Sequence, residues 1–122
     1  MFIIAWVDAL EINSKCGVSP FITQPKAIKA SYFFIFFEIP VTISKNIKKY
    51  DGFIALGCVI KGETPHFDFI SSASTQAIMK LSVDNKKPIG NGILTCLNMR
   101  QAKARDKKGK EAAKAVISVL DQ

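Results

Sequence analysis

The chain has 122 residues, of which 48% are hydrophobic and 22% are charged, so it can bury the core of one domain, is too short for two, and is not a disordered tail. Its formal net charge of +7 is uneven, because residues 100–114 carry seven basic and two acidic side chains (net +5) and the rest of the chain only +2. The charge therefore does not favour a protein whose whole surface binds nucleic acid. It favours a basic C-terminal segment that binds phosphate.

Several other classes are also excluded. The longest apolar stretches, 32–37 and 53–60, are far shorter than the roughly 20 residues that cross a bilayer. Residues 1–8 have neither a basic start nor a small-residue cleavage site, so we expect no secretory signal. Three scattered cysteines (Cys16, Cys58 and Cys96) indicate free thiols in a reducing cytoplasm. With a single histidine in the chain, we expect no metal site.

In chain order, the first predicted elements are a helix over residues 7–15 and a strand over 32–37 that Pro40 closes. A helix over 41–49 follows. Residues 53–60 then form a continuous apolar run, which is typical of a strand buried on both faces.

The second half of the chain has clearer signals. Thr64 and Pro65 supply an N-cap and a first helical position, and apolar residues at helical spacing extend that helix to about residue 84. A strand over 89–95 follows Pro88, and an amphipathic helix over 112–120 ends the chain. The alternation of helices and strands predicts one α/β layered domain over residues 1–122, built on a parallel sheet.

The loop that follows Ile60 carries the chemistry. Ligands of open parallel sheets bind beyond the carboxyl ends of the strands. Gly62 lets the backbone approach a ligand, Thr64 adds a hydroxyl, and the amides at the next helix start favour an anion. His66, the only histidine, falls beside them and could move protons near pH 7. A loop of this kind is also a common helix start and a lone histidine is often structural, so the residues alone leave both interpretations open.

The sequence LGCVIKGETPHFD at 56–68 resembles the signature of the lumazine synthase family (6,7-dimethyl-8-ribityllumazine synthase). Other segments resemble family motifs in the same order: Phe-Glu-Ile-Pro at 37–40, the fourth strand at 88–95, Gln-Ala-x-x-Arg at 101–105 and a Lys-Gly helix start at 108–109. The resemblance covers residues 37–120. It implies a flavodoxin-like three-layer sandwich.

The resemblance also implies a reaction. The family condenses 5-amino-6-ribitylamino-uracil with 3,4-dihydroxy-2-butanone 4-phosphate in riboflavin biosynthesis, a transferase reaction that uses no metal or organic cofactor. It assembles as pentamers, or as 60-subunit shells of twelve pentamers, with active sites between adjacent subunits. The expected partners are therefore two small-molecule substrates and copies of the chain, without nucleic acid or membrane.

Carried over residue by residue, the resemblance assigns roles. Gly62, Glu63 and Thr64 would hold the phosphate, Arg105 of a neighbouring subunit would clamp it, and His66 would transfer protons. The other substrate-binding positions that it implies are Phe2, Phe36, Glu38, Cys58, Val59, Ile60, Asn91 and Lys108. The residues themselves also permit plainer interpretations: Arg105 and Lys108 as a solvated basic face, and Cys58 as a buried thiol.

The N-terminal third departs from the family. Family members open with a strand inside the sheet, and here the chain starts too late to supply it, so we expect that first strand to be missing. Phe2 has the spacing of the family's stacking aromatic, and Trp6 is the competing candidate. Phe34-Ile35-Phe36 stands in place of Pro-Gly-Ala, and Asn91 in place of an aromatic over the pyrimidine.

Two alternatives stay open beside the enzyme. One is a degenerate homologue that assembles or binds flavin-like ligands without turnover. The other is a small nucleic-acid-binding protein that uses residues 100–114. Against the latter, no aromatic side chains interleave with the basic ones as a stacking platform requires.

Overall fold

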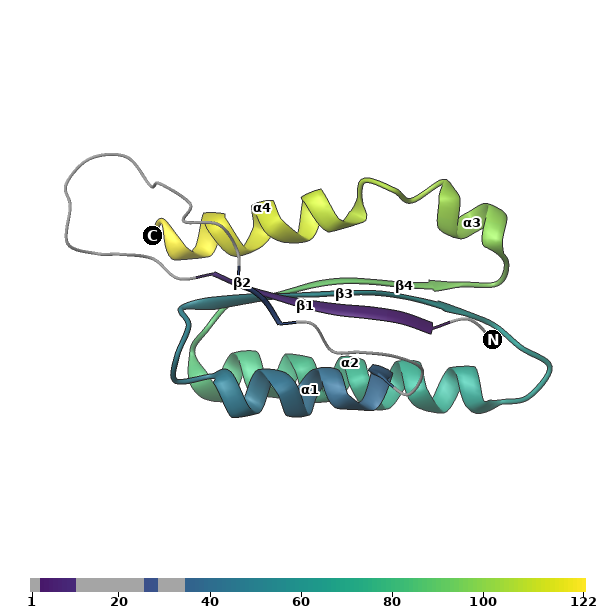
Figure 1. Cartoon of the computed structure of the whole chain (residues 1–122), viewed down its shortest axis with the longest axis horizontal. Helices are drawn as coiled ribbons and strands as arrows, with labels where there is room; N and C mark the ends of the chain where they lie inside the picture. The colour runs from purple at the N-terminus through teal and green to yellow at the C-terminus, as the bar shows by residue number, and fades with distance from the viewer. Residues whose placement is uncertain (1–2, 11–25, 29–34) are drawn as a thin grey trace.

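The computed structural model describes residues 3–10, 26–28 and 35–122 (Figure 1). Within these residues, the strands form one sheet in the order β2–β1–β3–β4. The helices α1 and α2 cover one face of the sheet, and α3 and α4 lie on the other, which gives three layers (Figure 1). In chain order the elements are β1 (Ile3–Leu10), β2 (Lys26–Ile28), α1 (Ile35–Asn46), β3 (Gly52–Ile60), α2 (His66–Asn85), β4 (Ile89–Cys96), α3 (Met99–Lys103) and α4 (Lys108–Leu120).

The α/β layered fold predicted from the sequence is confirmed, with a parallel pair of strands at one side of the described sheet. β3 and β4 run parallel, and the register places Phe53 opposite Ile89 and Ile60 opposite Cys96. The two N-terminal strands join in the other sense, since β1 is antiparallel to β3 and β2 is antiparallel to β1. The sheet is therefore mixed, and β1 occupies the place beside β3 on the side away from β4.

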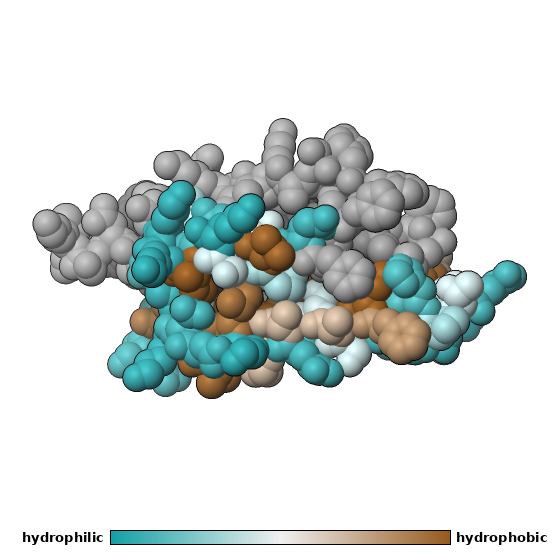
Figure 2. All heavy atoms as spheres, turned by 90° about the horizontal axis from the view of Figure 1, so that it is seen from below, coloured by the Kyte–Doolittle hydropathy of each residue, from teal (hydrophilic) through white to brown (hydrophobic). Residues whose placement is uncertain are grey.

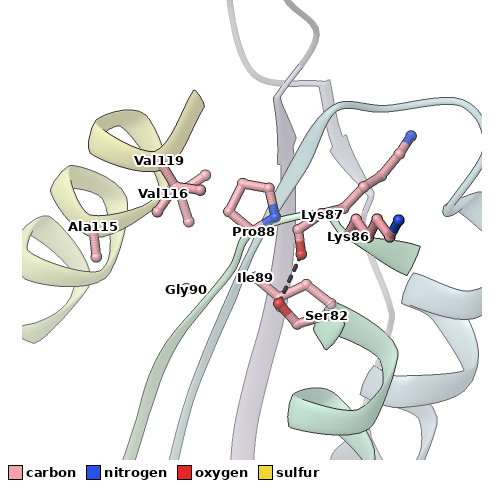
Figure 3. Close-up of a pocket in the computed structure, with 9 residues that line it drawn as sticks. All are labelled: Ser82, Lys86, Lys87, Pro88, Ile89, Gly90, Ala115, Val116 and Val119. Carbon is pink, nitrogen blue, oxygen red and sulfur yellow. Dashed lines mark hydrogen bonds between the residues drawn. The ribbon is translucent and has the colours of Figure 1, made fainter. Parts of the chain in front are cut away.

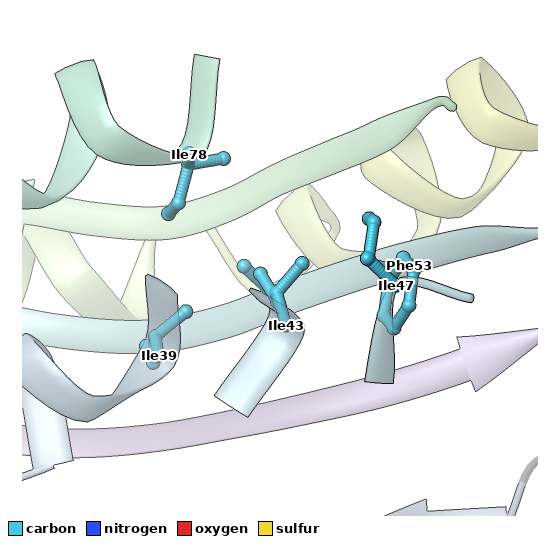
Figure 4. Packing of buried hydrophobic residues seen from close by; sticks show 6 residues of the cluster. Ile39, Ile43, Ile47, Phe53 and Ile78 are labelled. Atoms are coloured by element: carbon cyan, nitrogen blue, oxygen red, sulfur yellow. The ribbon is translucent and has the colours of Figure 1, made fainter. Parts of the chain in front are cut away.

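The core is built by the two faces of β3. Phe53, Ala55 and Val59 are fully buried on the side of α1 and α2, and Ile54 packs with α4 on the other side, as expected of a continuous apolar strand. Figure 4 shows three isoleucines of α1, four residues apart, with Phe53 beside Ile47, and these residues form one buried cluster with Ile78 of α2. Fully burying such a side chain contributes about 1.5–3 kcal/mol, which holds both helices on the sheet.

Two of the predicted N-terminal elements are wrong. Residues 7–10 belong to strand β1 rather than to a helix, and residues 11–15 of that prediction lie outside the described residues. Residues 35–37 open helix α1, which contains Pro40, so the predicted strand over 32–37 is wrong where it is described. The reason is that a short apolar run fits a buried strand and a buried helix equally well.

From Gly52 onward the predicted elements agree with the structure to within a few residues. One difference lies at the start of α2, where Thr64 was predicted as the N-cap. Pro65 occupies the N-cap position instead, and no side chain caps the helix. The C-terminal helix begins at Lys108, earlier than its apolar stripe indicated. The helix predicted over 41–49 is the second half of α1.

The outer side of α2 keeps apolar side chains in contact with solvent. Phe69, Met79 and Val83 are each more than 60% exposed, and Figure 2 shows this face of the molecule, with brown apolar and teal polar side chains intermixed. Among the described helices, none has both the length and the apolar character needed to cross a membrane.

Lys87 joins two distant parts of the chain. Its Nζ donates hydrogen bonds to the carbonyl oxygens of Ile47 (2.8 Å) and Tyr50 (2.6 Å) just beyond the end of α1. We expect Lys87→Met to lower the free energy of unfolding by about 2 kcal/mol, because bonds to charged groups contribute about 1.5–3 kcal/mol. Urea unfolding checks this, with Lys86→Met, at the exposed neighbouring position, as the matched control. Equal stability of the two variants would contradict the role of Lys87.

Candidate functional site

The expected site residues gather at the carboxyl edge of the parallel pair. β3 and β4 end side by side, and the N–H of Lys61 donates to the carbonyl oxygen of Cys96 (2.8 Å). The loop to α2 and helix α3 both begin at this edge (Figure 1). α1 runs back toward the edge where β3 begins (Figure 1), so its first turn, with the exposed Glu38, lies toward the same edge.

The loop between β3 and α2 is open to solvent. Gly62, Glu63 and Thr64 are all exposed, and a Cβ added to Gly62 would meet no atom within 4 Å. His66 is the first residue of α2 and is exposed as well. Because no side chain caps α2, the first backbone N–H groups of this 20-residue helix have no side-chain acceptor, and such a helix start favours an anion. The arrangement can bind a phosphate and place an imidazole beside it.

Lys61 adds a cation to this loop. Its Nζ lies 3.9 Å from Oδ2 of Asp68 and 5.9 Å from the centre of the Phe67 ring. An exposed pair of this kind contributes little to stability, so the ammonium remains available to a phosphate. The sequence prediction left Lys61 out, although its place directly before Gly62 was a sufficient signal.

The residues of β3 that precede the loop differ in their exposure to solvent. Val59 is buried against Phe67 and Ile70, so any contact with a substrate would come from its backbone. Ile60 and Cys58 are half-buried. Burial, and then the neighbouring Cys96, raise the pKa of the Cys58 thiol. Cys58 is therefore protonated at neutral pH, which favours the buried thiol over a nucleophile.

Arg105 lies in the turn between α3 and α4, and Lys108 is the first residue of α4. They line a cavity of about 620 Å³ beside β4, whose other walls are Ile93, Leu94, Thr95, Ala104, Asp106, Lys107 and Glu111. The guanidinium Nη1 of Arg105 donates to the carbonyl oxygen of Gln101 (3.1 Å), and Lys108 Nζ lies 3.4 Å from Glu111. No residue of the 61–66 loop lines this cavity.

Asn91 is exposed on β4, and its Oδ1 accepts a hydrogen bond from the N–H of Ile93 (3.0 Å). The amide oxygen is thus held by its own strand, and the amide NH₂ group is what it can offer a ligand. Phe2 lies outside the described residues. Trp6 is in β1 opposite Leu56, and Phe36 is in α1.

A second cavity of about 430 Å³ lies at the opposite edge, where α2 ends and β4 begins, against the last turns of α4. Figure 3 shows Lys86 and Lys87 pointing away from Val116 and Val119. The Ser82 hydroxyl donates a hydrogen bond to the carbonyl oxygen of Lys87 (2.7 Å). This cavity contains none of the expected site residues. Over residues 3–10, 26–28 and 35–122, no three His, Cys, Asp or Glu side chains group as metal ligands would.

Comparison with known proteins decides the family. The family model for 6,7-dimethyl-8-ribityllumazine synthase matches residues 35–122. The chain belongs to the 6,7-dimethyl-8-ribityllumazine synthase family. A family protein of Bartonella bacilliformis is 41% identical over 118 residues, which cover 92% of this chain and 74% of that protein.

Two further lumazine synthases give the same result over shorter spans. The protein of Agrobacterium fabrum is 47% identical over 96 residues (69% of this chain, 65% of the relative), and that of Corynebacterium kroppenstedtii is 45% identical over 87 residues (66% and 55%). The chain thus spans little more than half the length of some of the lumazine synthases that it matches.

The lumazine synthase match includes the open loop, His66 and Arg105, and leaves Phe2 outside. The sequence prediction missed Lys61 and also Lys107, which lines the cavity beside Arg105. Lys107 lies in the basic run of residues 100–114, where the sequence does not distinguish one lysine from another.

Proposed function

We propose that this chain is a lumazine synthase that joins 5-amino-6-ribitylamino-uracil to 3,4-dihydroxy-2-butanone 4-phosphate. An imine forms between the amino group and the ketone, phosphate leaves, and ring closure gives 6,7-dimethyl-8-ribityllumazine. The observation that carries the proposal is the open Gly62–Thr64 loop leading into an uncapped helix whose first residue is His66, inside the family match.

The loop residues are assigned by what they can do chemically. The free amides at the start of α2 and the Thr64 hydroxyl would bind the phosphate of the butanone, with the Lys61 ammonium close by. His66 would pass protons between the reacting amine, carbonyl and leaving group. Glu38, Phe36, Cys58, Val59, Ile60 and Asn91 remain the proposed contacts of the pyrimidine and ribityl groups. Holding two reactants together can supply about 7–11 kcal/mol of the barrier.

The second half of the phosphate site is assigned to a neighbouring copy. Arg105 and Lys108 line a cavity that the loop of the same chain does not enter, and a planar guanidinium suits a phosphate. We therefore propose a homo-oligomer with sites between adjacent subunits, in the pentamers or 60-subunit shells of the family. A cytoplasmic location is part of the proposal, and the free thiols of Cys58 and Cys96 support it.

Complementation tests the proposal. Arg105→Ala and His66→Ala subunits should each form little lumazine alone, measured by its absorbance. After joint unfolding and reassembly at equal amounts, about a quarter of the sites should combine one intact loop with one intact Arg105, if subunits mix at random. Activity should then rise well above that of either variant. No recovery would contradict a shared site, and binding of a ribityl-pyrimidine without product in the unsubstituted chain would favour the non-catalytic homologue.

A further inference from the structure

The turn that carries Arg105 has little packing to hold it. α3 has only five residues, Met99–Lys103, and none of them is buried. A helix this short is not stable by itself, so its hydrogen bonds must fix where the following turn lies. The position of the guanidinium therefore depends on the residues that make those bonds.

Gln101 makes three of these bonds. Its side-chain Oε1 accepts from the N–H of Leu97 (2.8 Å), just beyond the end of β4. Its backbone N–H donates to Oδ1 of Asn98, the N-cap of α3 (3.0 Å). Its carbonyl oxygen accepts from Nη1 of Arg105 (3.1 Å). One residue thus connects the end of the sheet, the cap of the helix and the guanidinium.

We propose that Gln101 is a positioning residue that holds Arg105 ready for the phosphate of the substrate, an inference that rests on the proposed function. A free arginine side chain samples many rotamers, and binding would have to order it. The bond to the Gln101 carbonyl uses one of the five guanidinium donors and restricts the side chain before the ligand arrives. The amide side chain of Gln101 keeps that carbonyl in place.

The test compares Gln101→Met, which keeps the length of the side chain and removes its acceptor, with the unsubstituted full chain. We expect the KM for the butanone phosphate and the inhibition constant of inorganic phosphate to rise about five-fold, as for the loss of one hydrogen bond. The KM for the ribitylamino-uracil and kcat should change less than about two-fold. Gln76→Met, on an exposed glutamine of α2 that bonds Ser72, is the matched control and should leave all four constants unchanged.

A double-mutant cycle separates positioning from a general structural effect. In an Arg105→Ala background, Gln101→Met should add less than about a two-fold change in phosphate affinity, because the group that it positions is gone. An equal additional loss in that background, or a parallel fall in kcat and in pyrimidine affinity, would overturn the inference. If Arg105→Ala itself leaves phosphate affinity unchanged, the proposed function of Arg105 fails instead, so the two failures are distinct.

Discussion

His66→Ala should lower kcat for lumazine formation about 100-fold, at the lower end of what a positioned general acid or base contributes. His66 is exposed at the first position of α2, and its loss leaves the loop amides and the Thr64 hydroxyl in place. The inhibition constant of inorganic phosphate should therefore change less than about two-fold. Steady-state kinetics, with inorganic phosphate as the inhibitor, measures both constants for each variant.

The same experiment needs a control on the same helix. Lys80→Ala removes an exposed side chain that bonds to Asp84 one turn away, a contact of little energetic weight, and should leave kcat unchanged. An unaltered kcat in His66→Ala would remove His66 from the proton transfers. A loss of phosphate binding equal to the loss of rate would instead make His66 part of the anion site.

Gly90→Ala should be the most destabilising small substitution at the interface between β4 and α4. A Cβ at this position would lie 2.5 Å from the carbonyl oxygen of Ala112 and 2.9 Å from Cγ2 of Val116. The backbone of α4 would have to move away, and overpacking of this kind costs about 1–3 kcal/mol, occasionally more. We expect the free energy of unfolding to fall by about 3 kcal/mol, measured by urea unfolding at one fixed subunit concentration.

Gly109→Ala is the matched control for this substitution. Gly109 lies in the first turn of α4, where a Cβ would come no closer than 3.4 Å to Leu56 Cδ2, and alanine favours a helix. Its stability should equal or slightly exceed that of the unsubstituted chain. If both variants unfold at the same urea concentration, close contact between β4 and α4 does not determine the stability of this layer.

The second half of the fold could be predicted because its signals are local. Pro65 and Pro88 mark the starts of α2 and β4, and the continuous apolar run 53–60 has few alternatives to a buried strand. The N-terminal elements could not be predicted in the same way. An apolar run such as 32–37 does not show its period, and whether β1 pairs parallel or antiparallel with β3 depends on contacts some 50 residues away.

The residues of the candidate site also differ in how well the sequence predicts them. The loop and His66 are consecutive in the sequence, so the motif alone placed them together. The connection between Gln101 and Arg105 depends on the geometry of a five-residue helix without buried residues, which no apolar period announces. Lys107 was missed because a lysine within a basic run carries no distinguishing pattern, whereas the place of Lys61 directly before Gly62 was a signal that the prediction did not use.

The amide of Asn91 has a consequence for the solubility of the chain. β4 is an edge strand of the described sheet, and an exposed edge strand can pair with strands of other molecules and so lead to aggregation. The side-chain oxygen of Asn91 already accepts a hydrogen bond from the N–H of Ile93. This N–H is therefore not free to bond to another strand. At the position where the family resemblance leads one to expect an aromatic ring, an asparagine therefore leaves this strand with one backbone donor fewer for pairing with another strand.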